Sequence, residues 1–200
     1  MKSLIVRLML VLTAFMAVPN AFAADTAGGD VFLDAKVGKT YGGPGTYAAG
    51  YSSTTQSSWG AAGGYRWRLD DARSLGFEVG YMHFGDVFSS EDPMGFSASQ
   101  ESLSAISAGV NYRFLFGDDK AWHFQTRVGL TRVKTDSSYS YFPPVGPAAS
   151  GSASSNSTGA YLGFGIGRRV TQDFSLSLVF DHYNSDLNME FLGLEAEYRF

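Results

Sequence analysis

The chain has 200 residues, with 19 acidic and 15 basic side chains and a formal net charge of −4 at pH 7. A mildly acidic chain gives no electrostatic reason to expect nucleic acid as a partner. Because there is no cysteine, disulfide bonds and thiolate metal sites are excluded.

The first segment has the pattern of a secretory signal peptide. Lys2 and Arg7 precede an apolar run, Leu8 to Val18, that only Thr13 interrupts, and the small-residue pattern Ala21-Phe22-Ala23 follows. A basic start, a short apolar run and an A-x-A site are typical of cleaved export signals, and the run is too short for a confident spanning helix. We therefore predict that residues 1–23 are a signal peptide and that residues 24–200 form one exported domain.

Beyond residue 23 no apolar stretch approaches twenty residues, so we expect no helical membrane span. Instead, eight segments alternate with period two, which predicts strands. In each segment, apolar residues fall mostly on one set of alternate positions, which we call one parity, and Gly, Ser and charged residues fall on the other. The segments are 31–39, 59–68, 74–84, about 100–114, 122–135, about 158–170, 174–183 and 190–200.

The connections between these strands alternate in length. Short turns at 69–73, 115–121 and 171–173 are rich in Asp and Gly, as hairpin turns are. Long connections, 40–58, 85–99 and 136–157, lie between them, and the connection 184–188 is brief. This pattern predicts an all-β fold, an eight-stranded antiparallel up-and-down transmembrane barrel with short periplasmic turns and longer extracellular loops.

The 24 Gly, 16 Phe and 11 Tyr residues indicate which parity faces inward. An eight-stranded barrel is only wide enough inside for side chains, so the glycine-bearing parity fits the lumen and the bulky parity fits the lipid side. A soluble barrel of the lipocalin type is the alternative, and it would place its apolar face inward around a ligand.

Three sequence segments carry a family resemblance: SLGFEVGYMHF at 74–84, SAGVNYRF at 107–114 and the terminal EYRF. With the order and spacing of the strands, they resemble the small eight-stranded outer-membrane barrels, OmpX/Ail-like and OmpA transmembrane-domain-like. The resemblance covers essentially the whole mature chain. It implies a monomer in the cell outer membrane of a Gram-negative envelope, surrounded by outer-membrane lipid and lipopolysaccharide.

Twelve charged residues fall on the parity expected to face the lumen. Because unpaired charges there would be costly, we predict an ion-pair network that fills the lumen. The alternative is a small gated pore of the sort that the OmpA resemblance suggests. The residues are Asp34, Lys36, Arg66, Arg68, Glu78, Arg113, Arg127, Arg169, Asp181, Glu195, Glu197 and Arg199.

Aromatic residues on the opposite parity cluster toward strand ends, where we expect girdles at the two membrane interfaces. Tyr198 and Phe200 at the terminus resemble the aromatic end by which the barrel assembly machinery recognises outer-membrane proteins. Glu195 stands where that signal usually has glycine. The expected girdle residues are Trp59, Tyr65, Trp67, Tyr81, Tyr112, Phe114, Trp122, Tyr198 and Phe200.

An enzymatic alternative rests on the segment Asp181-His182-Tyr183-Asn184-Ser185. It is similar in content to the His-x-Ser-Asn motif of PagL, a lipid A deacylase, but Ser185 follows His182 by three residues instead of two. Glu190 would be the helping acid. Because residues three apart on a strand lie on opposite faces, we expect no catalytic residues and keep the deacylase as an alternative.

We also expect no metal or cofactor, because His83, His123 and His182 have no matching ligand cluster. The long loops mix Tyr, Ser and Gly, as in Tyr41, Gly42–Gly45 and Ser138–Phe142, and such loops are typical of binding surfaces. We therefore expect a structural or surface-interaction role, with adhesion to a host or matrix ligand as the hypothesis that the Ail resemblance implies.

Overall fold

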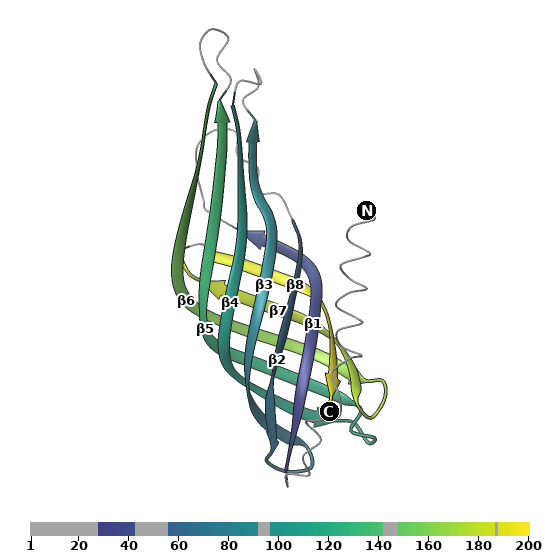
Figure 1. Ribbon diagram of the computed structural model, residues 1–200. Helices are drawn as coiled ribbons and strands as arrows, with labels where there is room; N and C mark the ends of the chain where they lie inside the picture. The colour runs from purple at the N-terminus through teal and green to yellow at the C-terminus, as the bar shows by residue number, and fades with distance from the viewer. Residues whose placement is uncertain (1–27, 43–55, 92–96, 142–147, 187) are drawn as a thin grey trace.

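The computed structural model describes residues 28–42, 56–91, 97–141, 148–186 and 188–200, which form eight strands (Figure 1). The predicted signal peptide and the loop at 43–55 lie outside these residues. The strands are β1 (Gly29–Gly42), β2 (Gln56–Arg68), β3 (Arg73–Glu91), β4 (Ser97–Phe116), β5 (Trp122–Tyr141), β6 (Ala149–Arg169), β7 (Phe174–Asn184) and β8 (Asn188–Arg199).

Each strand pairs antiparallel with the next, and β1 pairs with β8 to close the barrel. The predicted count, order and closure are therefore confirmed. The first and last strands of the chain meet in register, with Asp34 opposite Glu197 and Lys36 opposite Glu195. No helix among the described residues has the length and apolar character needed to cross a membrane.

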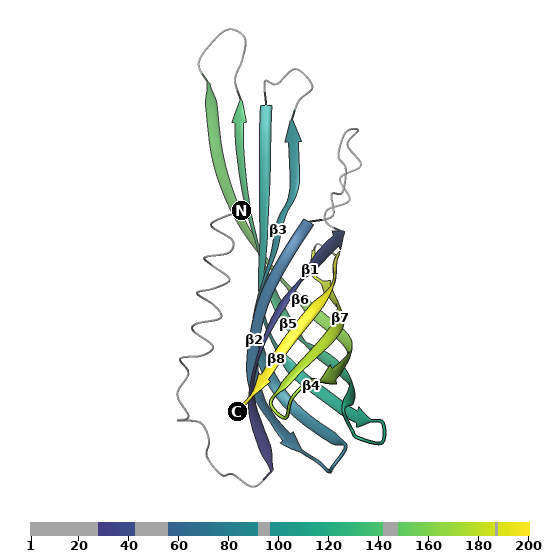
Figure 2. The same ribbon diagram turned by 90° about the vertical axis from the view of Figure 1, so that its right-hand side faces the viewer.

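Four of the strands run further than the sequence predicts. Pairing of β3 with β4 continues to Glu91 opposite Ala98, and pairing of β5 with β6 continues to Tyr141 opposite Ala149. The expectation that 85–99 and 136–157 are loops is wrong for most of both segments. Figure 2 shows these four strands rising beyond the rest of the barrel. We call residues 85–91, 97–103, 135–141 and 149–155 the four-strand extension.

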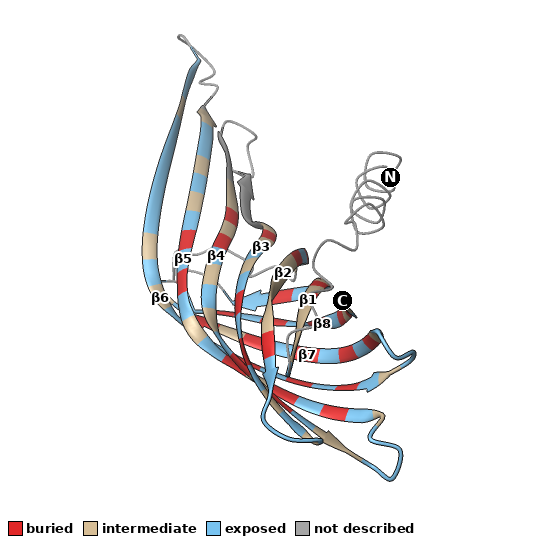
Figure 3. Cartoon of the chain, turned by 60° about the horizontal axis from the view of Figure 1, so that its bottom comes forward, coloured by how far each residue is buried: buried red, intermediate tan, exposed pale blue. Residues whose placement is uncertain are grey.

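The two faces of the barrel wall have the predicted polarity. Large apolar side chains lie on the outer surface, where Leu130 is 67% exposed and Ile106 is 61% exposed, while Asp181 and Glu195 are fully buried inside. Figure 3 shows the alternation of buried and exposed residues along the strands. A lipocalin-type barrel would have the reverse arrangement, so that alternative is wrong for this chain.

The orientation follows from the connections. The turns after β2, β4 and β6 are short, and β1 begins and β8 ends at the same edge of the barrel. In outer-membrane barrels short turns lie on the periplasmic side and longer connections on the extracellular side. The four-strand extension therefore projects from the extracellular side.

Candidate functional site

The periplasmic half of the lumen is organised around one carboxylate, Glu197. Both Arg66 and Arg113 donate two hydrogen bonds to it, at 3.0 and 3.2 Å and at 2.5 and 2.6 Å. The Arg66 guanidinium also lies 4.2 Å from the centre of the Phe32 ring. Paired, bidentate contacts of this kind are the geometry that makes buried charges tolerable.

The centre of the lumen holds a second cluster, in which two cations are shared among three acids. Lys36 Nζ lies 3.0 Å from Asp181 and 3.7 Å from Glu195. Arg127 contacts Glu195 closely, and its nitrogens lie 3.4 Å from Glu78 and 3.6 Å from Asp181. Each acid here meets at least one cation, so removing one cation would leave more than one carboxylate undercompensated.

Two amides connect the clusters. Gln125 donates to Glu195 at 2.7 Å and accepts from Arg113 at 2.9 Å. Asn111 accepts from Arg66 and donates to Glu78, both at 3.0 Å. The sequence places Asn111 and Gln125 on the inward parity, but counting only charged residues omits them from the site.

Tyr161 is a further lumen residue that the sequence analysis did not select. Its hydroxyl donates to Glu78 Oε1 at 2.7 Å, and the residue is 2% exposed. Gly109 and Gly129 face each other beneath this ring, and a Cβ on Gly129 would lie 2.6 Å from the Tyr161 ring. The glycines on the inward parity therefore leave the space that the aromatic ring occupies.

Asp34 is buried without a hydrogen bond. Neither of its carboxylate oxygens has a partner in the described part of the chain. The described lumen holds five buried carboxylates, those of Asp34, Glu78, Asp181, Glu195 and Glu197, and four buried cations, those of Lys36, Arg66, Arg113 and Arg127. Asp34 is thus the one buried carboxylate of this set that has no hydrogen-bonded partner in the network.

Two of the residues predicted for the lumen lie at its periplasmic rim instead, and a third, Arg199, lies between the rim and the lumen. The Arg68 side chain is 63% exposed and pairs with Asp30 at 2.9 Å, and Arg169 donates to the backbone oxygen of Lys120. Arg199 donates to the Gln172 carbonyl and lies 4.0 Å from Glu197. The lumen assignment of Arg68 and Arg169 is wrong, because a long side chain at a strand end can reach water.

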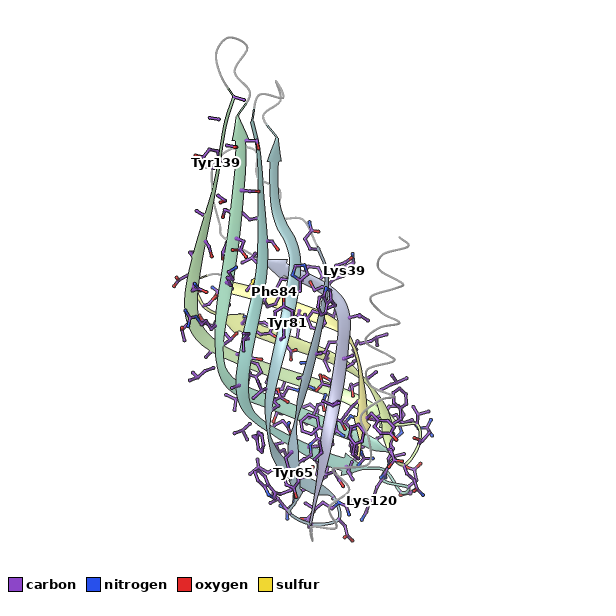
Figure 4. The ribbon with its side chains drawn as sticks, in the orientation of Figure 1. Lys39, Tyr65, Tyr81, Phe84, Lys120 and Tyr139 are labelled. Carbon is purple, nitrogen blue, oxygen red and sulfur yellow. The ribbon has the colours of Figure 1, made fainter. Side chains whose placement is uncertain are left out.

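The extracellular end of the lumen is mainly apolar, with the buried hydroxyls of Thr40 and Ser58 beside it, which the sequence analysis did not predict. The Phe84 and Tyr183 rings meet here with their centres 5.0 Å apart, and Figure 4 shows Phe84 near the base of the extension. The signal is in the sequence, because the inward parity turns apolar toward the extracellular ends of the strands. The cluster is Met82, Phe84, Leu103, Ala105, Val133, Tyr161, Val179, Tyr183, Met189 and Phe191.

Between the apolar cluster and the central charges lies one small cavity. Its volume is about 10 Å³, and Lys36, Glu78 and Tyr161 are among its lining residues. A polar cavity of this size holds about one water molecule.

Aromatic residues lie on the outer wall at both ends of the barrel. Toward the extracellular side, Trp59 contacts Tyr81 and His83, with ring centres 5.7 and 5.8 Å apart. Toward the periplasmic side, Trp67 contacts Tyr65 and Phe77 in the same way, and Figure 4 shows Tyr65 near that end. These positions match those of the interfacial girdles of outer-membrane barrels.

The terminal strand places the two residues of the predicted assembly signal side by side. The rings of Tyr198 and Phe200 have centres 4.9 Å apart, and the Phe200 backbone N–H donates to Val31 at 3.0 Å. Tyr198 is 41% exposed on the outer wall.

The residues of the enzymatic alternative lie at the extracellular end of β7 and β8. His182 and Glu190 are opposite each other on these strands, and His182 Nδ1 lies 3.9 Å from Glu190 Oε1, beyond hydrogen-bonding distance. Ser185 follows the end of β7. Within the described residues, no group of three or more His, Cys, Asp or Glu side chains has the geometry to hold a metal ion.

Comparison with known proteins identifies the family. The model of the outer membrane protein beta-barrel domain family matches residues 8–200. The chain belongs to this family. The resemblance to small outer-membrane barrels is therefore confirmed, and the cell outer membrane is its location.

Solved structures give the same fold at low sequence identity. Ail, the attachment invasion locus protein of Yersinia pestis, is 15% identical, with a TM-score of 0.55 over 88% of this chain and 100% of Ail. Ail in complex with the heparin analogue sucrose octasulfate is 13% identical, with a TM-score of 0.53 over 86% of this chain and 99% of that one.

A major outer membrane protein from Thermus thermophilus is 13% identical, with a TM-score of 0.50, and the match covers 86% of this chain and 99% of that one. No curated protein matches the sequence. These likenesses support the fold, whereas the function has to be argued from the surface and the lumen.

Proposed function

We propose that this protein is a surface-interaction protein whose barrel is a closed anchor and whose four-strand extension is the binding element. The observation that carries the proposal is the length of β3–β6. These strands remain paired well beyond the point where β2 and β7 leave their neighbours. Strand segments that continue beyond the membrane are not required for spanning it, so we infer that they act at the cell surface.

Within the described residues, the extension has two backbone edges that no paired strand covers. β3 pairs with β2 only as far as His83, so residues 86–91 have no described strand on that side, and β7 pairs with β6 only from Ala160, so residues 149–158 have none either. An unpaired strand edge is a template onto which another extended chain can pair. Tyr139, 56% exposed on the extension, adds an aromatic contact.

The ligand class is a host or matrix component. Ail, whose fold this chain shares, is named for attachment and has been solved with a heparin analogue. Those properties belong to Ail, but they make matrix proteins and heparin-coated surfaces the first ligands to test with this chain.

The test is a shortened extension. Asp136 is opposite Ser154, so residues 136–154 can be removed and replaced by an Asn-Gly turn, which suits a two-residue hairpin. Bacteria producing this variant should lose adhesion to matrix-coated surfaces while producing as much barrel as the parent. Unchanged adhesion to every surface to which the parent binds would overturn the proposal.

We further propose that the lumen is closed, against the gated-pore alternative. Support comes from two stacked layers of buried side chains, the charged network and the apolar cluster above it, which an ion would have to disrupt together. In planar-bilayer recordings the protein should show no conductance steps at any voltage. Regular single-channel steps that survive repurification would favour the pore.

We propose no enzymatic role, because the 3.9 Å separation of His182 and Glu190 does not form the hydrogen-bonded base that a serine nucleophile needs. The lipid A of cells producing the protein should keep its mass. Loss of an acyl chain that requires His182 would instead establish the deacylase alternative.

A further inference from the structure

The outer wall of β5 changes chemistry abruptly at its extracellular end. Leu130 is the most exposed of the large apolar side chains in the described residues, and the next outward positions are Arg132, Lys134, Asp136 and Ser138, all exposed. The same wall that meets lipid below therefore continues upward as a polar surface. It is one continuous face of one strand, because outward positions recur every second residue.

The outward positions of β6 that lie beside this segment are all hydroxyl or amide side chains. Lys134 is opposite Asn156, and Asp136 is opposite Ser154, which also hydrogen-bonds to Asp136. The lumen-side positions of the same β6 segment are mixed: Ala149, Gly151 and Ala153, followed by Ser155 and Ser157. We call the outward set the hydroxyl face: Arg132, Lys134, Asp136, Ser138, Ser150, Ser152, Ser154, Asn156 and Thr158.

The base of the hydroxyl face carries an uncompensated positive charge. Lys134 Nζ donates to Asp136 at 2.7 Å, which balances those two charges. Arg132 is exposed between Ile106 and Thr158, and no hydrogen bond or ion pair joins it to the described residues. Tyr81 of the extracellular aromatic band is opposite Ile106, so Arg132 belongs to the same ladder row as that band.

We propose that the hydroxyl face docks against the phosphorylated sugars of lipopolysaccharide in the surrounding outer leaflet. The exposed Arg132 guanidinium, in the ladder row that also holds Tyr81, is able to bind a phosphate with two parallel hydrogen bonds. The hydroxyls and the amide above it can donate to and accept from sugar hydroxyls. The apolar wall below would meet the acyl chains of the same glycolipid.

Continuity and charge select this occupant. The face rises without a break from the lipid-facing wall, so the first groups that it meets above the acyl chains are lipid head groups. An exposed, unpaired cation next to that lipid-facing wall is complementary to an anionic head group. The inference goes beyond the proposed function, which concerns the free edges, because docking of this face would hold the extension in place and leave the edges available.

The absence of cysteine allows a test with single labels. Ser152→Cys places a thiol on the hydroxyl face, and Ala153→Cys places one on the lumen-side face of the same strand, where it is also exposed. Each variant is reconstituted in nanodiscs of phospholipid, of lipid A, which lacks the core sugars, and of rough lipopolysaccharide, which carries them. The measured quantity is the rate of reaction with a water-soluble maleimide.

The expected result is a several-fold slower reaction of the Ser152→Cys variant in lipopolysaccharide nanodiscs alone, with the Ala153→Cys variant unchanged in all three. Adding Arg132→Gln to Ser152→Cys should restore much of the rate. Ser150→Cys repeats the measurement at an adjacent outward position if the Ser152→Cys variant does not fold.

Three outcomes would overturn the proposal. Equal rates for the two thiols in lipopolysaccharide would show that the face is free. Equal slowing in lipid A would show that the core sugars are not what covers the hydroxyl face. Slowing in phospholipid that grows with the number of copies per nanodisc would show that a second copy covers the face.

Discussion

Asp34 and Asp181 are both buried carboxylates in the lumen, but only Asp181 has a hydrogen-bond partner. Lys36 donates to Asp181 at 3.0 Å, whereas both oxygens of Asp34 lack a donor in the described part of the chain. The described lumen also has one more buried carboxylate than buried cations. The two aspartates therefore make different contributions to stability, although the sequence pattern treats them alike.

The Asp181→Asn and Asp34→Asn variants should differ accordingly. Asp181→Asn leaves Glu195, 3.7 Å away, as the one carboxylate paired with Lys36 among the described residues, and breaking a buried ion pair costs about 3–5 kcal/mol. Asp34→Asn removes an excess negative charge and no hydrogen bond, so it should cost less than about 1 kcal/mol or stabilise. Urea unfolding in lipid vesicles measures both, and equal destabilisation would contradict this account of Asp34.

The periplasmic turn between β2 and β3 supplies a pH-dependent contribution. Arg73 Nε donates to Asp70 at 2.6 Å, and the backbone N–H groups of Ala72 and Arg73 donate to the same carboxylate. The hydrogen bond from the Arg73 side chain, followed by that from Ala72, holds the pKa of Asp70 below its ordinary value of 3.8.

A folded-state pKa below the unfolded one stabilises the protein above the unfolded pKa, and this stabilisation is lost as the pH falls through the folded pKa. The parent should therefore unfold more slowly than Asp70→Asn near neutral pH. The difference should vanish well below pH 3.8. Unfolding rates in urea at the two pH values test this, and a difference that persists in acid would exclude the carboxylate as its cause.

At the scale of the strand, the lumen depends on where glycine is placed. A Cβ on Gly129 would meet the Ala108 backbone oxygen most closely and would lie 2.6 Å from both the Tyr161 ring and Gly109 Cα, whereas a Cβ on the outward Gly63 would meet the flexible end of Leu33 at 2.6 Å. Gly129→Ala should cost about 1–3 kcal/mol through overpacking. It should also disturb the Tyr161–Glu78 hydrogen bond.

Gly63→Ala is the matched control and should change the free energy of unfolding much less, because Leu33 can adopt another rotamer toward lipid. Tyr161→Phe removes only the hydroxyl and isolates the hydrogen-bond part of the effect. If Gly129→Ala and Gly63→Ala have the same unfolding midpoint, the contact with Tyr161 does not constrain the barrel.

The strands also show which parts of the fold the sequence could predict. Alternation with one apolar face identified all eight membrane strands, because lipid requires that face. It could not identify the four-strand extension, because outward positions there on β6, such as Ser152 and Ser154, are polar and no apolar face marks the strand. Backbone hydrogen bonds between neighbouring strands continue through the extension, and the alternation of side chains does not reveal them.

For the whole barrel, parity predicts which residues enter the lumen but not which of them meet. Arg113 and Glu197 are 84 residues apart in sequence, and their contact depends on the register accumulated across intervening strands. The same limit explains Arg68 and Arg169, which share the inward parity but lie near the periplasmic turns. Whether an inward side chain lies in the lumen or at the rim depends on its distance from the end of the strand, which parity does not measure.

The complete molecule allows assembly in the cell to be separated from stability. Tyr198 and Phe200 contact each other at the periplasmic end of the closing strand, and Tyr198 is exposed on the outer wall. If the assembly machinery reads these rings, the double variant Tyr198→Ser and Phe200→Ser should fall in abundance in the outer membrane of cells. Refolded in detergent, it should still run as a compact, heat-sensitive band on gels, because the lumen network remains intact.

A matched control is the outward Trp67→Ser, which removes an aromatic ring from the same end of the barrel but from β2. It should reach the outer membrane at near-parent levels. Loss of the compact band in the refolded terminal variant would assign Tyr198 and Phe200 to stability. Equal losses in cells for the terminal and Trp67 variants would assign them to the girdle, because a recognition signal must be specific to the last strand.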